Sequence, residues 1–72
     1  MIKVGVVGYG YWGPKLARNI NSSNFFKIDY IIDNSKKNLD KAKKDFPLTE
    51  ILRNYNILKK GDIDLVVISS PT

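Results

Sequence analysis

The 72-residue chain contains no cysteine and no histidine. Without cysteine, neither a disulfide bond nor a thiolate metal site can form. The lack of histidine removes the commonest metal ligand and the side chain that most often acts as a general base. No apolar run approaches the roughly 18 residues of a membrane-spanning helix, and the N-terminus does not have the layout of a signal peptide. We therefore expect a cytoplasmic protein with no metal site and no membrane partner.

Acidic residues are few relative to basic ones. Lys and Arg number 12 against 7 Asp and Glu, which gives a formal net charge of +5. Most lysines lie within residues 36–44 or at positions 59 and 60, and no aromatic residues are interleaved with them. Because single-stranded nucleic acids are held by aromatic stacking as well as by charge, this pattern favours a solvated helix face over nucleic-acid binding. The net charge is compatible with a mild attraction for phosphorylated ligands.

The most informative segment is a β-branched run that leads into three glycines at fixed spacing. The run predicts a strand over residues 2–7, and a helical pattern follows the G-x-G-x-x-G turn. In a dinucleotide site the first glycine permits a tight turn, the second admits the pyrophosphate and the third lets the helix pack closely. The amides of the first helical turn, including those of Tyr11 and Trp12, would then point at the phosphates. The three glycines are Gly8, Gly10 and Gly13.

An acidic residue lies where the same kind of site needs one. Asp33 ends the second predicted strand, about 20 residues beyond Gly13, where a carboxylate can accept hydrogen bonds from the adenosine ribose. The alternative is that Asp33 only caps a helix. Lys36 and Lys37 could reach a 2′-phosphate and favour NADP, but Asp33 would repel that phosphate. We therefore expect NAD rather than NADP.

The rest of the chain alternates strand and helix patterns, which predicts an α/β fold with a truncated, doubly wound, Rossmann-like parallel sheet. Trp12 is expected to pack its ring under the first helix, together with Leu16 and Ile20. Ser35 can cap the second helix and Pro47 ends it. The order is β-α-β-α-β-α-β, with strands over residues 2–7, 25–32, 49–53 and 65–68 and helices over 11–22, 36–45 and 54–58.

Two parts of this prediction leave alternatives open. Residues 48–60 also fit a single helix, and a strand followed by a helical turn is preferred because a doubly wound unit needs a strand there. The continuous apolar run at 65–68 is typical of a strand buried on both faces. Ser69 and Ser70 follow it at the edge where open α/β sheets bind ligands. Ordinary strand-end hydrogen bonding is the alternative for both serines.

These motifs resemble the opening of the Gfo/Idh/MocA oxidoreductases. The matching segments are residues 4–13, 16–19 and 62–72, so the resemblance covers essentially the whole chain. It implies hydride transfer between NAD(P) and a carbon of a sugar or polyol. The Tyr-Trp-Gly form of the turn, with Arg18 and Asn19 in the helix, is similar to members that act on sugars and nucleotide sugars.

The resemblance also implies that residues 1–72 are the N-terminal portion of a dinucleotide-binding domain. Family members have a catalytic lysine in a Glu-Lys-Pro motif and a later substrate domain, and no residue here matches either. Lys59 and Lys60 precede the last strand and are not that lysine. A non-catalytic, nucleotide-sensing Rossmann module is the alternative function. We also expect an open sheet edge beside residues 65–68, which would favour self-association or a homo-oligomer.

Overall fold

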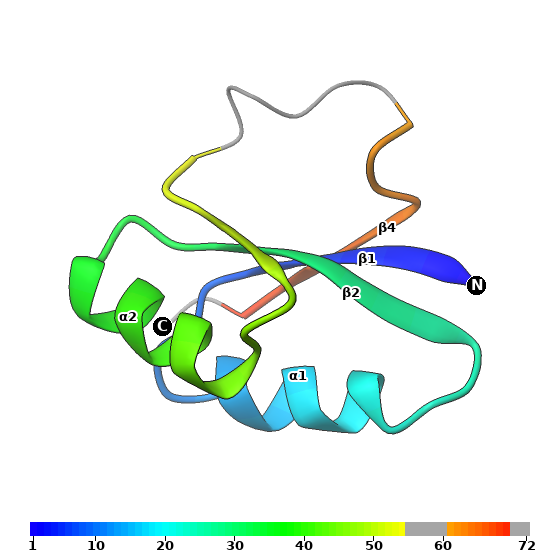
Figure 1. Ribbon diagram of the computed structural model, residues 1–72, viewed down its shortest axis with the longest axis horizontal. Helices are drawn as coiled ribbons and strands as arrows, with labels where there is room; N and C mark the ends of the chain where they lie inside the picture. The colour runs from blue at the N-terminus through cyan, green and yellow to red at the C-terminus, as the bar shows by residue number, and fades with distance from the viewer. Residues whose placement is uncertain (55–60, 70–72) are drawn as a thin grey trace.

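A computed structural model describes residues 1–54 and 61–69. The described strands form one parallel sheet in the order β3-β2-β1-β4, which confirms the predicted α/β class. Both helices lie on the same side of this sheet (Figure 1). The predicted helical turn at 54–58 falls almost entirely within residues 55–60, outside the described part. The elements are β1 (Ile2–Val7), α1 (Gly13–Asn21), β2 (Phe26–Ile32), α2 (Lys36–Asp45), β3 (Glu50–Leu52) and β4 (Leu65–Ile68).

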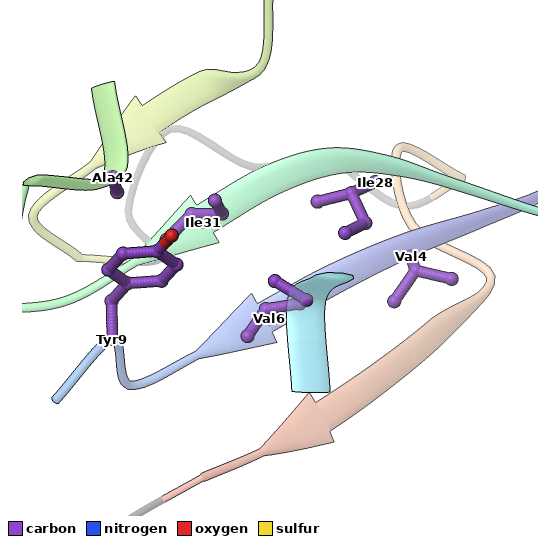
Figure 2. Close-up of a cluster of buried hydrophobic side chains, with 7 residues drawn as sticks. Val4, Val6, Tyr9, Ile28, Ile31 and Ala42 are labelled. Carbon is purple, nitrogen blue, oxygen red and sulfur yellow. The ribbon is translucent and has the colours of Figure 1, made fainter. Parts of the chain in front are cut away.

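A small apolar core fills the space between the sheet and the two helices. Val4 and Val6 of β1 and Ile31 of β2 are fully buried there, as Figure 2 shows. Each helix contributes an alanine, Ala17 from α1 and Ala42 from α2, and both are also fully buried. Because alanine has so small a side chain, the helix backbones can lie close to the β-branched residues of the sheet. This packing fixes the helix N-termini near the ends of the strands.

Strand β2 departs from the simple alternation that its sequence suggests. The pairing with β1 shifts register between Val4 and Gly5, so that Val4 faces Ile28 while Gly5 faces Tyr30. One residue of β2 is therefore left over, as in a β-bulge. After this shift Ile31, rather than Tyr30, enters the core. Tyr30 is only partly buried for this reason.

The bounds of α2 agree with the predicted ones. The Ser35 side chain caps the helix by accepting a hydrogen bond from the backbone N–H of Asn38 at 3.4 Å. At the other end the N–H of Phe46 still reaches the carbonyl of Ala42, and Pro47 follows. Proline disfavours helical geometry in the residue before it, which explains why the helix ends there.

The apolar sequence of β4 predicts a strand that is buried on both faces, and this prediction is wrong. It pairs with β1 alone and is an edge of the described sheet, with Leu65, Val66 and Ile68 42, 47 and 66% exposed. Only Val67 packs against the core. The apolar residues of β4 therefore pair with β1 and pack one side chain, Val67, against the core. The other face of the strand is not covered by any residue within 1–54 and 61–69.

The start of β4 is tied to the start of β1. The backbone N–H of Lys3 donates to the Asp64 carboxylate at 3.0 Å, and the N–H of Asp64 donates to the Lys3 carbonyl at 2.8 Å. The Lys3 ammonium also donates to the carbonyl of Gly61 at 2.8 Å. These contacts set the register between the two strands, so that their carboxyl ends reach the same edge as the glycine turn.

Candidate functional site

The glycine turn follows β1 directly, and two of its glycines are required by the protein's own packing. Gly8 has a positive φ of 96°, which is strained for other residues. A side chain at Gly8 would also collide with the carbonyl of Ser69. At Gly13 a side chain would meet the Gly8 carbonyl, so the first turn of α1 lies directly on the glycine turn. The predicted roles of Gly8 and Gly13 agree with these contacts.

Gly10 differs from the other two because nothing in the protein crowds it. A methyl group there would have only the Asn38 side-chain nitrogen near it, at 3.8 Å. Beside it, the backbone N–H groups of Gly10, Tyr11 and Trp12 have no hydrogen-bond partner within residues 1–54 and 61–69. Helix α1 also lacks a side-chain cap, so its N-terminus presents unpaired donors. Open space next to unpaired amides is what a pyrophosphate needs.

Trp12 does not pack under α1, contrary to the prediction. It is the residue just before the helix, where its side chain leaves the apolar stripe, and it is 56% exposed. Its ring meets the ring of Tyr11, itself 74% exposed, edge to face with centroids 5.1 Å apart. The Lys15 ammonium lies 4.8 Å from the centroid of Trp12 and 5.2 Å from that of Tyr11. Two aromatic rings and a cation thus flank the unpaired amides.

The Asp33 carboxylate links the end of β2 to the glycine turn. Its Oδ2 accepts from the backbone N–H of Tyr9 at 2.7 Å and from the Asn38 side-chain amide at 3.1 Å. Its Oδ1 accepts from the N–H of Ser35 at 2.8 Å. Burial would by itself raise the pKa of the Asp33 carboxyl, but the hydrogen bonds from Tyr9, Ser35, Asn38 and Asn34 outweigh it and lower the pKa. The carboxylate is therefore ionised near neutral pH.

Tyr9 is a site residue that the sequence did not reveal. Its side chain is 1% exposed and lies in the core, where Figure 2 shows its ring beside Ala42 and Ile31. Its hydroxyl donates to the Asp45 carboxylate at 2.6 Å, and its ring meets Phe46 edge to face. Burial, followed by the bond to Asp45, raises the pKa of the Tyr9 hydroxyl. Tyr9 thereby anchors the glycine turn to the far end of α2.

A cavity of about 450 Å³ opens beside these groups, at the carboxyl ends of three strands. That volume suits part of a small-molecule ligand. A similar hollow of about 470 Å³ lies between α1 and α2, but it adjoins neither Gly8 nor Asp33. Of the two, only the first cavity therefore adjoins the glycine turn and Asp33. Its lining residues are Val7, Gly8, Ile32, Asp33, Asn34, Arg53 and Asn54.

The predictions for the two serines after β4, Ser69 and Ser70, have different outcomes. The backbone N–H of Ser69 donates to the Val7 carbonyl at 2.7 Å, which continues the β1–β4 ladder. Ser69 is also buried against Gly8. The strand-end alternative thus describes its backbone, and a cofactor contact by its hydroxyl stays a prediction. Ser70 lies outside the described residues, and its predicted role stays a prediction as well.

Across residues 1–54 and 61–69, His, Cys, Asp and Glu form no group of three or more that could hold a metal ion. Neither described helix has the length and apolar composition to cross a membrane.

Comparison with known proteins decides the family. The model of an oxidoreductase family with an NAD-binding Rossmann fold, GFO_IDH_MocA, matches residues 2–72. The chain belongs to this family. Its members are described as NAD-binding oxidoreductases, which confirms the predicted resemblance and its cofactor. A comparison with curated proteins finds no match.

Solved structures agree with the family. The chain is similar to scyllo-inositol dehydrogenase from Lactobacillus casei, a structure with bound NAD(H) and scyllo-inositol, at 33% identity and a TM-score of 0.81 over 99% of this chain. A Klebsiella pneumoniae protein assigned as an oxidoreductase matches at 27% identity and a TM-score of 0.82, also over 99% of this chain. The chain spans 22% of the first structure and 20% of the second.

Lys15, Asn38 and Arg53 also lie at the site and were absent from the sequence-based prediction. Lys15 lies in the first turn of α1, directly after the glycine turn, and this position next to the turn could have signalled the contact. Asn38 follows the Ser35 cap by three residues, which places it in the first turn of α2. Arg53 follows β3 directly, so the rule that ligands bind at strand carboxyl ends could have found it.

Proposed function

We propose that the glycine turn and Asp33 bind one NAD molecule. The observation that carries this proposal is the combination of unpaired amides at Gly10, Tyr11 and Trp12 with an open space above Gly10. The pyrophosphate is held by these amides and by the positive end of the α1 dipole. The adenosine half extends toward Asp33 and the cavity beside it.

The residues present fit this cofactor chemically. Asp33 is an ionised acceptor at the end of β2, as ribose hydroxyls require, and Lys15 adds a positive charge beside the amides. A 2′-phosphate would bring a second negative charge to the Asp33 carboxylate, which supports NAD over NADP. The exposed rings of Tyr11 and Trp12 add apolar surface next to the pyrophosphate amides.

For the whole protein, we propose hydride transfer between NAD and a sugar, polyol or nucleotide-sugar. Bound NAD supplies the nicotinamide carbon that accepts or donates the hydride. The described residues bind and orient the cofactor, and none of them is assigned to the chemical step. The similarity to a dehydrogenase that holds a cyclic polyol supports this substrate class. The proposed location is the cytoplasm.

Isothermal titration of the purified protein with NAD, NADP and AMP tests the binding proposal. We expect NAD and AMP to bind, and NADP to bind more weakly by about tenfold, which corresponds to about 1.4 kcal/mol. Equal affinity for NAD and NADP would contradict the role given to Asp33. For the whole protein, binding of NAD without any turnover of sugars or polyols would instead favour a nucleotide-sensing module.

A further inference from the structure

The Asp33 carboxylate has little acceptor capacity to spare. A carboxylate offers about four lone-pair positions. The protein directs four donors at them, namely the backbone N–H groups of Tyr9, Asn34 and Ser35 and the side-chain amide of Asn38. A ribose donates through two neighbouring hydroxyls, for which no position is left. At least one of the protein donors must therefore leave when a nucleotide binds.

The backbone donors and the Asn38 amide differ in how easily they can leave. The N–H groups of Tyr9 and Ser35 belong to the backbone, at 2.7 and 2.8 Å from the carboxylate. Moving either one would disturb the glycine turn or the start of α2. The bond from the Asn38 amide is longer, at 3.1 Å, and a rotation of its side chain is enough to break it.

Asn38 can make this rotation without loss to the helix. Its backbone N–H, rather than its side chain, makes the capping bond to the Ser35 hydroxyl. Its side chain is half-buried, and its nitrogen lies at the open space above Gly10, between the turn and Asp33. The carboxamide therefore lies on the path between the pyrophosphate site and the ribose site.

We propose that, in the free protein, the Asn38 carboxamide occupies the acceptor position on Asp33 that a ribose hydroxyl uses. The carboxamide leaves this position when an adenosine nucleotide binds. Asn38 is then a residue that sets affinity for ribose-bearing nucleotides by competing with them for Asp33. The proposal rests on the proposed function of Asp33. It also defines the ligand chemistry, because only a ligand whose hydroxyls donate to Asp33 needs the exchange.

The first test uses the unmodified protein. Side-chain amide resonances of Asn38 are followed by NMR during titration with AMP and with 2′,3′-dideoxy-AMP. We expect AMP to shift the Asn38 amide pair and the dideoxy compound to leave it in place, while both shift the backbone amides of the glycine turn. If AMP shifts the turn amides and leaves the Asn38 pair unmoved, the exchange is wrong and the proposed function stands. If AMP moves neither, both fail.

The second test measures affinity in variants. Asn38→Ala removes the competing donor, so AMP should bind about three- to tenfold more tightly, as expected for one hydrogen bond that no longer has to be broken. Affinity for 2′,3′-dideoxy-AMP should not change. Asn19→Ala, which removes the same group from the exposed surface of α1, is the matched control and should leave AMP affinity unchanged. Weaker AMP binding by Asn38→Ala would overturn the proposal, and so would an equal gain for both ligands.

Thermal melts of the two variants keep the second test interpretable. The Asn38 side chain does not cap α2, so we expect Asn38→Ala to fold with a melting temperature close to that of Asn19→Ala. If Asn38→Ala does not fold, the carboxamide is a structural part of the site. That result would contradict an exchangeable role.

Discussion

The backbone N–H of Tyr9 donates a 2.7 Å hydrogen bond to the Asp33 carboxylate, across 24 positions of the sequence. This bond joins the glycine turn after β1 to the end of β2. Asp33 therefore has a structural role as well as its proposed role toward the ribose. A substitution at Asp33 changes both, so stability and binding have to be measured separately.

The first prediction concerns acid stability. The pKa of Asp33 is lowered in the folded protein, so its contribution is complete above the ordinary value of 3.8 and is lost as the pH falls through the folded pKa. In Asp33→Asn this contribution is absent. Urea unfolding from pH 6 down to about pH 2 should therefore show a steeper loss of stability in the unmodified protein than in the variant. Parallel curves would mean that the carboxylate is not held by these donors.

The second prediction separates two glycines of the turn. In Gly13→Ala the new methyl group meets the Gly8 carbonyl, so we expect a loss of about 1–3 kcal/mol in the free energy of unfolding. In Gly10→Ala the methyl group has open space, so stability should stay within about 0.5 kcal/mol. Its affinity for NAD should still fall, because the methyl group occupies the pyrophosphate's place. Unfolding and NAD titrations of both variants check this contrast.

If Gly10→Ala keeps full affinity for NAD, the pyrophosphate does not lie over Gly10. If Gly13→Ala is as stable as the unmodified protein, α1 can move away from the turn.

The third prediction concerns the buried phenol. Tyr9→Phe keeps the ring in the core and removes the hydrogen bond to Asp45, so we expect a loss of about 1–2 kcal/mol in the free energy of unfolding. The raised pKa of Tyr9 adds an alkaline signature. The unfolded chain deprotonates above the ordinary value of 10.0 while the folded protein holds the proton, so stability falls above that pH. The fall should be smaller in Tyr9→Phe.

Denaturant unfolding between pH 8 and about pH 11 measures both effects. An equally steep alkaline loss in Tyr9→Phe would show that other groups cause it.

The fourth prediction uses the single tryptophan. Trp12 is the only tryptophan in the sequence, and it lies beside the amides that are proposed to hold the pyrophosphate. NAD should therefore change its fluorescence. Lys15→Met should weaken NAD binding about two- to fivefold at low salt, and the difference should shrink as salt screens the charge.

Lys41→Met is the control for Lys15→Met, because Lys41 lines the separate hollow between the helices. An equal loss of affinity in both variants would mean that only net charge matters.

The sequence predicted the elements well where local signals agree. The bounds of α2 follow from the Ser35 cap and from Pro47, both of which act on neighbouring residues. The positive φ of Gly8 and the packing of Gly13 follow from the glycine spacing. Asp33 was also located by spacing alone, and the structure brings it to the turn.

What the sequence did not predict depends on contacts between distant residues. The bulge in β2 arises from its pairing with β1, and it moves Ile31 into the core in place of Tyr30. Tyr9 and Asp45 meet across 36 positions, for which no local pattern exists. Trp12 fits the apolar stripe by spacing, yet it precedes the helix, so the helical periodicity does not apply to it.

The most direct measurement is an NMR titration of the protein with NAD, followed at every backbone amide. We predict the largest shifts at the unpaired amides of Gly10, Tyr11 and Trp12, together with shifts at Asp33 and Asn34 as the ribose approaches. Shifts centred instead on Arg18 and Lys41, in the hollow between the helices, would contradict this site.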